Sequence, residues 1–392
     1  MKKQRIVFID SDINIDYINK IVKGRQSIGG VWTVANNKVI PSMTCSQDTL
    51  SHATLCSKMF FEHITCACEL FFINIWEGDE LKANINALLA ALSWCLKNEV
   101  TLINLSLGTT LILDIPPLFQ VINKLIEKNI IIVAASSNER KLTFPAAFDH
   151  VIGVKALSSK SAEVGFIYQE NSLDLIEISC YVKDEVIEYQ GNYYPLYAAN
   201  SLAAPMISAK ICNLLSKGYE SIEEIKVKLK EQSLPASYQQ DDKIYQQYFK
   251  QEIEIPVIAV INDHHGNSFD IPSLIQKLLT AFSEQDYHGI CLSEKRTTNL
   301  VQKTLNLTNF EGYSLIEKLH FYTHYCNVDY VIVEGSHDFL LNNFKAEDLD
   351  ILLHHSEFSH FKEEKKAPSI VLLEDQDFDV LFNQLYHRLS EE

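Results

Sequence analysis

The stretch Ile6-Val7-Phe8-Ile9-Asp10 decides the fold expectation, because four apolar residues run directly into a single carboxylate. A short apolar run bounded by polar residues is typical of a buried strand in a parallel sheet. Parallel α/β sheets build their sites outside the carboxyl ends of the strands. We therefore expect Asp10 to face a functional site.

Two further segments place a polar residue before small residues and a helical pattern. They are Ser51-His52-Ala53-Thr54 and Asn200-Ser201-Leu202-Ala203-Ala204-Pro205. His52 and Ser201 are therefore predicted at helix N-termini, where backbone donors point outward. Pro205 is expected in the first turn of its helix, since a missing N–H costs nothing there.

Asp10, His52 and Ser201 supply the three groups of a serine-protease triad. A hydroxyl is a poor nucleophile at neutral pH, so it needs an imidazole to take its proton and a carboxylate to orient that imidazole. The alternative for each residue is structural. Asp10 and Ser201 would then be helix caps, which both residue types favour, and His52 a surface histidine.

Residues 1–215 resemble the subtilases, the subtilisin-like serine peptidase family, because further motifs of that family follow in order. These motifs are a helix at 86–95, the strand 102–108 containing Asn104-Leu105-Ser106-Leu107-Gly108, the strand 130–135 leading to Asn138, Phe144-Pro145-Ala146, and 151–156. The resemblance implies an α/β fold with a subtilisin-like parallel sheet flanked by helices.

The same resemblance implies roles for the site residues. Ser201 would attack a peptide carbonyl with His52 as the base, and Asp10 would orient His52. Asn138 and the backbone N–H of Ser201 would stabilise the oxyanion. Three residues would pair with the substrate backbone as an added strand: Ser106, Leu107 and Gly108.

Several positions depart from the family pattern. Ala53, Ser137 and Ala199 stand where the family usually has glycine, and Asn200 stands where it usually has threonine. Glycine at such positions serves close approach or special backbone angles. The sequence therefore leaves open a narrow or slow enzyme, and also a pseudoprotease that only binds peptides.

Beyond Leu215 the pattern changes and then alternates again between strand and helix signals. We expect a peptidase domain over 1–218, a connector over 219–254, and a second, smaller parallel α/β domain over 255–392. The last region distantly resembles a degenerate P-loop-like domain. Asn267 stands in place of the phosphate-binding lysine and Ile261 in place of the first glycine, which disfavours nucleotide binding.

Metal and cofactor sites are not expected. His264, His265, Glu334 and His337 offer a metal site only as a minor alternative, and Cys66-Ala67-Cys68 lacks a second cysteine pair at zinc-binding distance. The segment after His52 is short and lacks the oxygen ligands of a calcium loop. We predict no cofactor, and a docking, dimerisation or binding role for the region 255–392.

Net charge, cysteine content and the first residues of the chain indicate which partners and which cellular location to expect. The net charge of −17 disfavours nucleic acid as a partner. Nine cysteines, an odd number, mostly lie in apolar patterns and indicate free thiols. Residues 1–5 leave no room for a signal peptide, and no apolar run is long enough to span a bilayer. We expect a cytoplasmic protein without membrane contact, and the abundance of Ile, Lys and Asn hints at a bacterial source.

The sequence therefore predicts a serine endopeptidase of narrow specificity, such as one that removes a leader from a modified precursor peptide. A leader or an activator would dock on the second domain. The alternatives are a regulatory or defence protease that a partner activates, and a non-catalytic peptide-binding scaffold.

Overall fold

The computed structural model describes residues 3–22, 24–42, 49–76, 83–158, 165–170, 172–235, 245–262, 270–308, 313–355, 369–372 and 377–390. The chain forms two compact units, residues 1–238 and 239–392. Residues 219–238 of the expected connector thus lie in the first unit, and residues 239–254 lie in the second. Helix α6 (Ile222–Glu231) shows why, since its Ile225 and Leu229 are buried in the core of the first unit.

A nine-stranded sheet forms the centre of the first unit, with the strand order β3-β2-β4-β1-β5-β6-β7-β9-β8. The strands are β1 (Gln4–Asp10), β2 (Gln26–Ala35), β3 (Lys38–Pro41), β4 (Cys68–Asn74), β5 (Leu102–Leu105), β6 (Ile131–Ala135), β7 (Ile152–Ser158), β8 (Phe166–Tyr168) and β9 (Ile178–Val182). Only the edge strands β3 and β8 pair antiparallel. The fold prediction is confirmed.

Strand β1 occupies the middle of this sheet, between β4 and β5. Ile6 to Asp10 are all buried, which explains the unbroken apolar run in the sequence. Asp10 pairs in register with Asn74 of β4, and Ile9 with Leu105 of β5. The carboxyl ends of three neighbouring strands therefore meet beside Asp10.

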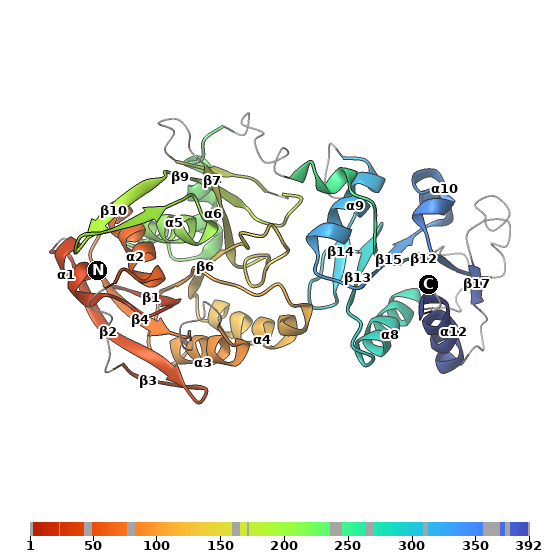
Figure 1. The fold of residues 1–392 in the computed structure, drawn as a ribbon, viewed down its shortest axis with the longest axis horizontal. Coiled ribbons are helices and arrows are strands. Elements are labelled where there is room, and N and C mark those ends of the chain that lie inside the picture. The colour runs from red at the N-terminus through yellow and green to blue at the C-terminus, as the bar shows by residue number, and fades with distance from the viewer. Residues whose placement is uncertain are drawn as a thin grey trace. The chain divides into compact units, whose positions relative to one another are not determined.

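Helices cover both faces of the sheet. Figure 1 shows α2 (His52–His63) and α5 (Asn200–Leu215) on one face and α3 (Ile85–Cys95) and α4 (Ile115–Ile126) on the other. Phe60 of α2 packs edge-on against Phe8 of β1, with ring centroids 5.4 Å apart. The first unit also contains α1 (Ile15–Ile21), the 3-10 helix η1 (Ile112–Asp114) and an antiparallel hairpin of β10 (Glu185–Tyr189) and β11 (Asn192–Leu196).

Pro205 corrects one expectation. Helix α5 begins at Asn200, so Pro205 lies inside the helix and not in its first turn. A proline in a helix interior cannot donate to the carbonyl four residues earlier, which here belongs to Ser201. That carbonyl accepts a hydrogen bond from the Cys56 thiol of α2 instead, at 3.3 Å. A side chain from another helix thus replaces the missing donor.

The second unit contains a six-stranded sheet in which every pair is parallel, with the order β14-β13-β15-β12-β16-β17. Its strands are β12 (Val257–Ile261), β13 (Gly289–Ser293), β14 (Thr304–Asn306), β15 (Tyr330–Gly335), β16 (Ile351–His355) and β17 (Ser369–Leu372). The helical elements are η2 (Tyr248–Lys250), α8 (Ile271–Ser283), α9 (Leu315–Tyr325), α10 (His337–Asn343), η3 (Ala346–Asp348) and α12 (Phe378–Ser390).

The carboxyl ends of these strands hold one buried carboxylate. Glu334 of β15 receives a hydrogen bond from Asn262 Nδ2 at 2.6 Å and forms an ion pair with Arg296 Nε at 2.6 Å. Two neighbouring donors thus hold its two oxygens.

The loop that resembles a phosphate loop, with His264, His265 and Asn267, lies outside the described residues. Among the helices that the structure describes, none is long and apolar enough to cross a bilayer.

The packing of α2 on β1 makes a direct prediction. Replacing Phe60, which is fully buried, by alanine should lower the free energy of unfolding of the first unit by about 3–5 kcal/mol, because a large ring is lost from a packed core. Urea unfolding followed by far-UV circular dichroism measures this change. The control Val227→Ala alters an exposed side chain on α6 and should change the stability by less than about 0.5 kcal/mol. An equal loss in both variants would contradict the packing.

Candidate active site

Asp10 is the innermost group of the site. Its side chain is 1% exposed at the end of β1. One carboxylate oxygen, Oδ1, accepts from the backbone N–H of Ser11 at 2.6 Å and lies 2.7 Å from Nδ1 of His52. The other oxygen, Oδ2, is buried and has no hydrogen-bond partner among the described residues. A buried carboxylate needs a compensating charge, and the imidazole of His52 is the group placed to supply it.

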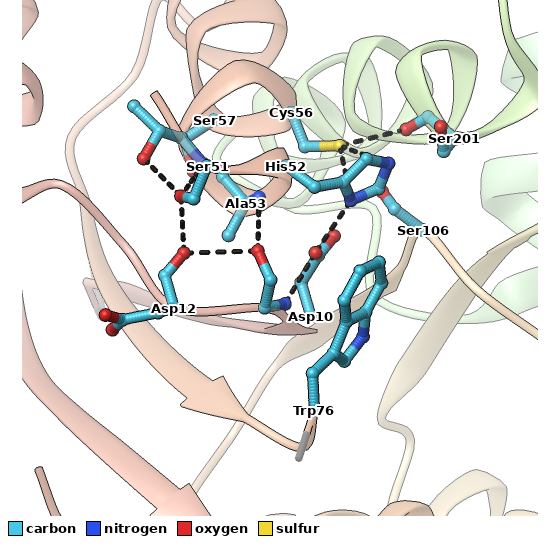
Figure 2. Close-up of polar contacts among 12 residues, drawn as sticks. Asp10, Asp12, Ser51, His52, Ala53, Cys56, Ser57, Trp76, Ser106 and Ser201 are labelled. Carbon is cyan, nitrogen blue, oxygen red and sulfur yellow. Dashed lines mark hydrogen bonds and ion pairs between the residues drawn. The ribbon is translucent and has the colours of Figure 1, made fainter. Parts of the chain in front are cut away.

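His52 is the first residue of α2, and the turn after β1 fixes that end of the helix. Ser51 caps the helix by accepting from Thr54 N, and its hydroxyl donates to the carbonyl of Asp12 at 2.5 Å. The backbone N–H of Ala53 donates to Ser11 Oγ at 2.9 Å. Figure 2 shows these contacts side by side below the imidazole. The residues that follow Asp10 thus dock the helix that carries His52.

The environment of His52 favours its charged form. Burial acts against the imidazolium, but the Asp10 carboxylate, through its charge and its hydrogen bond, outweighs burial and raises the pKa of His52. The ring also stacks on Trp76, with centroids 5.6 Å apart and planes inclined by 21°. The carboxylate fixes the tautomer, and carboxylate and indole together fix the orientation of the ring. Nε2 then lies on the side away from Asp10.

Ser201 is the second residue of α5 and is 9% exposed. Figure 2 shows the imidazole of His52 between Asp10 and the end of α5 that carries Ser201. Cys56, one turn after His52 in α2, lies in the same cluster. Its thiol donates to the carbonyl of Ser201 and lies 3.8 and 3.9 Å from the two ring nitrogens of His52. No hydrogen bond joins His52 to the Ser201 hydroxyl among the described residues, which is common before substrate binds.

Asn138 lies in the turn after β6, and its side chain reaches the start of α5. Its Oδ1 accepts from the backbone N–H of Asn200 at 2.9 Å, which assigns the amide orientation because a backbone N–H needs an oxygen acceptor. The amide nitrogen of Asn138 therefore remains free to donate. It lies close to Ser201, because Asn138 is bound to Asn200, the residue before Ser201. Neither this nitrogen nor the backbone N–H of Ser201 donates to another described residue.

Asn200 connects the segments around Ser201. Its Oδ1 accepts from the backbone N–H of Ala156 in β7 at 2.7 Å. Its Nδ2 donates to Ser136 Oγ and to the carbonyl of Ser137, both at 2.9 Å. One amide side chain therefore fixes β7, the turn before Asn138 and the start of α5 relative to one another.

The expected substrate segment follows β5. Ser106 is buried and its hydroxyl accepts from Asn104 at 3.0 Å, whereas Gly108 is exposed. Behind this segment, Thr109 and Phe144 exchange two backbone hydrogen bonds of 2.9 and 2.8 Å. An added Cβ at Gly108 would come within 2.6 Å of the Thr143 side chain and 2.8 Å of the Phe144 carbonyl, so glycine is required for this close approach.

The residues that replace the family's glycines keep ordinary backbone angles. Ala53, Ser137 and Ala199 are absent from the described residues with positive φ. Asn200, which stands where the family usually has threonine, is helical and has no positive φ either. These departures introduce no backbone strain at the site.

Three potential metal ligands also meet here. Oxygen, nitrogen and sulfur atoms of Asp10, His52 and Cys56 lie within 4.8 Å of one another, and no second group of three such ligands was found in the described part of the chain. Burial raises the pKa of the Cys56 thiol, so the sulfur is protonated at neutral pH. The spacing follows from the contact of Asp10 with His52 and the next turn of α2, and the expected absence of a metal stays a prediction.

Part of the chain that forms this site resembles known proteins. Residues 52–236 match the model of the subtilase family. The resemblance to the subtilases is confirmed. The minor extracellular protease Epr of Bacillus subtilis (strain 168) is 30% identical over 129 residues, which are 32% of this chain and 19% of Epr. Subtilisin DY of Bacillus licheniformis is 26% identical over 138 residues, which are 34% of this chain and 48% of that protein.

A solved structure is also similar to part of the chain. The prenylagaramide maturation protease PagA is 19% identical, with a TM-score of 0.40, over 58% of this chain and 81% of PagA. The chain spans about a fifth of Epr and about half of subtilisin DY. The second unit lies beyond the residues that the subtilase model matches.

The sequence analysis missed three residues around the candidate site: Cys56, Trp76 and, as the residue that connects its segments, Asn200. Cys56 had a signal, because it stands four residues after His52 and so on the same face of the predicted helix. The other two had none, since a stacking ring and a bridging amide depend on which segments meet in space.

The Asp10–His52 contact predicts that the pKa of His52 changes when Asp10 is replaced. Asp10→Asn removes the charge that favours the imidazolium and leaves the burial, so the pKa of His52 should fall by about 1–3 units. NMR titration of the imidazole protons measures this shift, and His63 at the far end of α2 is the internal control. His52 accepts a proton only when neutral, so the pH at which it becomes a competent base should fall with the pKa. An unchanged His52 titration would contradict the contact.

Proposed function

We propose that the chain is a serine endopeptidase that hydrolyses peptide bonds with Asp10, His52 and Ser201. The observation that carries the proposal is the 2.7 Å contact of buried Asp10 with His52 Nδ1, beside the helix end that presents Ser201. This contact leaves Nε2 of His52 as the nitrogen that takes the serine proton. The subtilase resemblance of residues 52–236 supports the reaction class.

In the proposed reaction Ser201 Oγ attacks the substrate carbonyl carbon while its proton passes to His52 Nε2. The imidazolium so formed is stabilised by Asp10, which stays ionised. When the C–N bond breaks, His52 gives the proton to the departing amine and an acyl group remains on Ser201. Water then attacks this ester with His52 again as the base, and Ser201 is regenerated.

The oxyanion would form between two donors that the described part of the chain leaves without an acceptor. They are the Asn138 amide nitrogen and the backbone N–H of Ser201 at the N-terminal end of α5. The Asn138 carbonyl is already bound to Asn200, so its amide is positioned before substrate arrives. Preorganised donors of this kind stabilise the charge that develops in the transition state.

Residues 106–108 would bind the substrate as an added strand. Among the described residues, no backbone hydrogen bond involves Leu107 or Gly108, and Thr109 is held from behind by Phe144. An extended peptide would gain main-chain hydrogen bonds along such an edge. Side-chain selectivity would come from other contacts.

We propose further that the substrate is a precursor peptide that loses a leader at one site. The second unit supports this idea as a separate, fully parallel α/β body available to bind a leader or an activator. We also place the reaction in the cytoplasm, because all eight cysteines that the structure describes are free.

Cleavage of a peptide library tests the reaction and its selectivity together. The full chain should cut a complex library at few sequences, and the new termini identify them. Ser201→Ala should abolish every cut, while the control Ser93→Ala, on α3 across the sheet, should leave the cuts unchanged. Cuts that persist in Ser201→Ala would refute the assigned nucleophile. Many unrelated cut sites would refute leader removal but keep the peptidase.

Asn138 is expected to act in the transition state. Asn138→Ala should lower kcat by about 10²–10³ with little change in KM, because one oxyanion donor is lost. Asn138→Asp keeps an oxygen to accept from Asn200 N–H but removes the amide donor. It should therefore lose the same factor while melting like the wild type. A near-normal kcat in Asn138→Asp would show that Asn138 only braces the helix.

A further inference from the structure

A pair of thiols lies at the ends of α2 and α5 that are remote from the triad. Cys212 is in the last turn of α5, and Cys66 follows α2 on the way to β4. Their sulfur atoms are 3.5 Å apart. Cys212 is fully buried, whereas Cys66 is partly exposed. The pair lies about 16 Å along α5 from Ser201, at the rise of an α-helix.

The neighbouring residue of α5 holds the two cysteines together. Asn213 Oδ1 accepts from the backbone N–H of Thr65 at 2.9 Å and from that of Cys66 at 3.1 Å. Its Nδ2 donates to the carbonyl of His63 at 3.0 Å. The backbone from His63 to Cys66 is thus fixed to α5, which holds the two sulfur atoms next to each other.

The two thiols have different reactivities. The hydrogen bond with the Cys212 thiol is the main cause that lowers the pKa of Cys66 to about 7, against the effect of burial. The same contact, a contact with Cys68 and burial raise the pKa of Cys212. Cys66 is therefore the partly exposed thiol that loses its proton more readily, and Cys212 is the buried thiol beside it.

We infer that Cys66 and Cys212 form a reversible disulfide in the presence of a peroxide, which staples α5 to the segment after α2. The Cys66 thiolate attacks one oxygen of hydrogen peroxide, the O–O bond breaks, and a sulfenic acid and hydroxide form. Cys212 sulfur then attacks Cys66 sulfur, the S–O bond breaks, and hydroxide leaves and takes up the Cys212 proton as water. In sum, two thiols and one peroxide give one disulfide and two waters.

The bridge would join the far ends of the two helices that begin at His52 and Ser201. It links residues 146 positions apart in sequence, so it would strongly restrict the unfolded chain. The melting temperature of the first unit should therefore rise on oxidation. The proposal does not depend on catalysis, because disulfide formation and melting are measured without a substrate.

The test treats the reduced full chain with a small excess of hydrogen peroxide and maps peptides without reduction. We expect a peptide pair joined through Cys66 and Cys212, a rise in melting temperature of about 5 °C, and reversal of both by dithiothreitol. Cys66→Ser should lose both effects. The control Cys95→Ser, at a cysteine buried in α3, should keep them.

Several outcomes would overturn the inference: a bridge between Cys66 and Cys68, a Cys66 sulfinic acid in place of the bridge, or no oxidation of Cys66 at all. One further measurement starts from the wild-type protein, so that poor folding of a variant does not decide the result. Alkylation of Cys66 by iodoacetamide should rise with pH around a midpoint near 7. In Cys212→Ala that midpoint should move up toward about 8.5, the value of a free cysteine. A wild-type midpoint already at the free value would contradict the paired thiols.

Discussion

The buried contact between Asp10 and His52 is the constraint that determines how the elements of the first unit are arranged. A carboxylate that is 1% exposed at the end of the central strand is costly without a partner, and the structure places the His52 imidazole 2.7 Å away. This requires the N-terminus of α2 to lie at the carboxyl end of β1. Ser11 and Asp12, which immediately follow the carboxylate, supply the hydrogen bonds that fix that end of the helix.

Helix α5 is fixed to the same point by contacts outside the triad. Pro205 removes the helical donor for the Ser201 carbonyl, and the Cys56 thiol of α2 takes its place. Asn200, just before Ser201, spans β7 and the turn that carries Asn138. His52, Ser201 and Asn138, the proposed base, nucleophile and oxyanion donor, are therefore positioned by one connected set of hydrogen bonds. At the opposite ends of the same helices, Asn213 and the Cys66–Cys212 pair repeat the connection.

Much of this arrangement follows from sequence patterns. The apolar run before Asp10 predicts a central strand, and the order of the subtilase motifs predicts the sheet that receives it. Strand 102–108 was predicted too long, because β5 ends at Leu105 and the remaining residues turn toward Phe144. The position of Pro205 was wrong because helix α5 starts at Asn200, and only the structure shows that a thiol from another helix offsets its missing donor. Contacts such as those of Trp76 and Asn200 depend on tertiary neighbours, which a single sequence does not encode locally.

The most direct measurement is the position of covalent labelling by a fluorophosphonate probe, mapped by mass spectrometry on the full chain. Labelling requires an activated serine but no knowledge of the substrate. Our account predicts that Ser201 alone is modified and that His52→Ala abolishes the reaction. Modification of another serine, or of Ser201 at an equal rate without His52, would contradict a triad built on the Asp10–His52 contact.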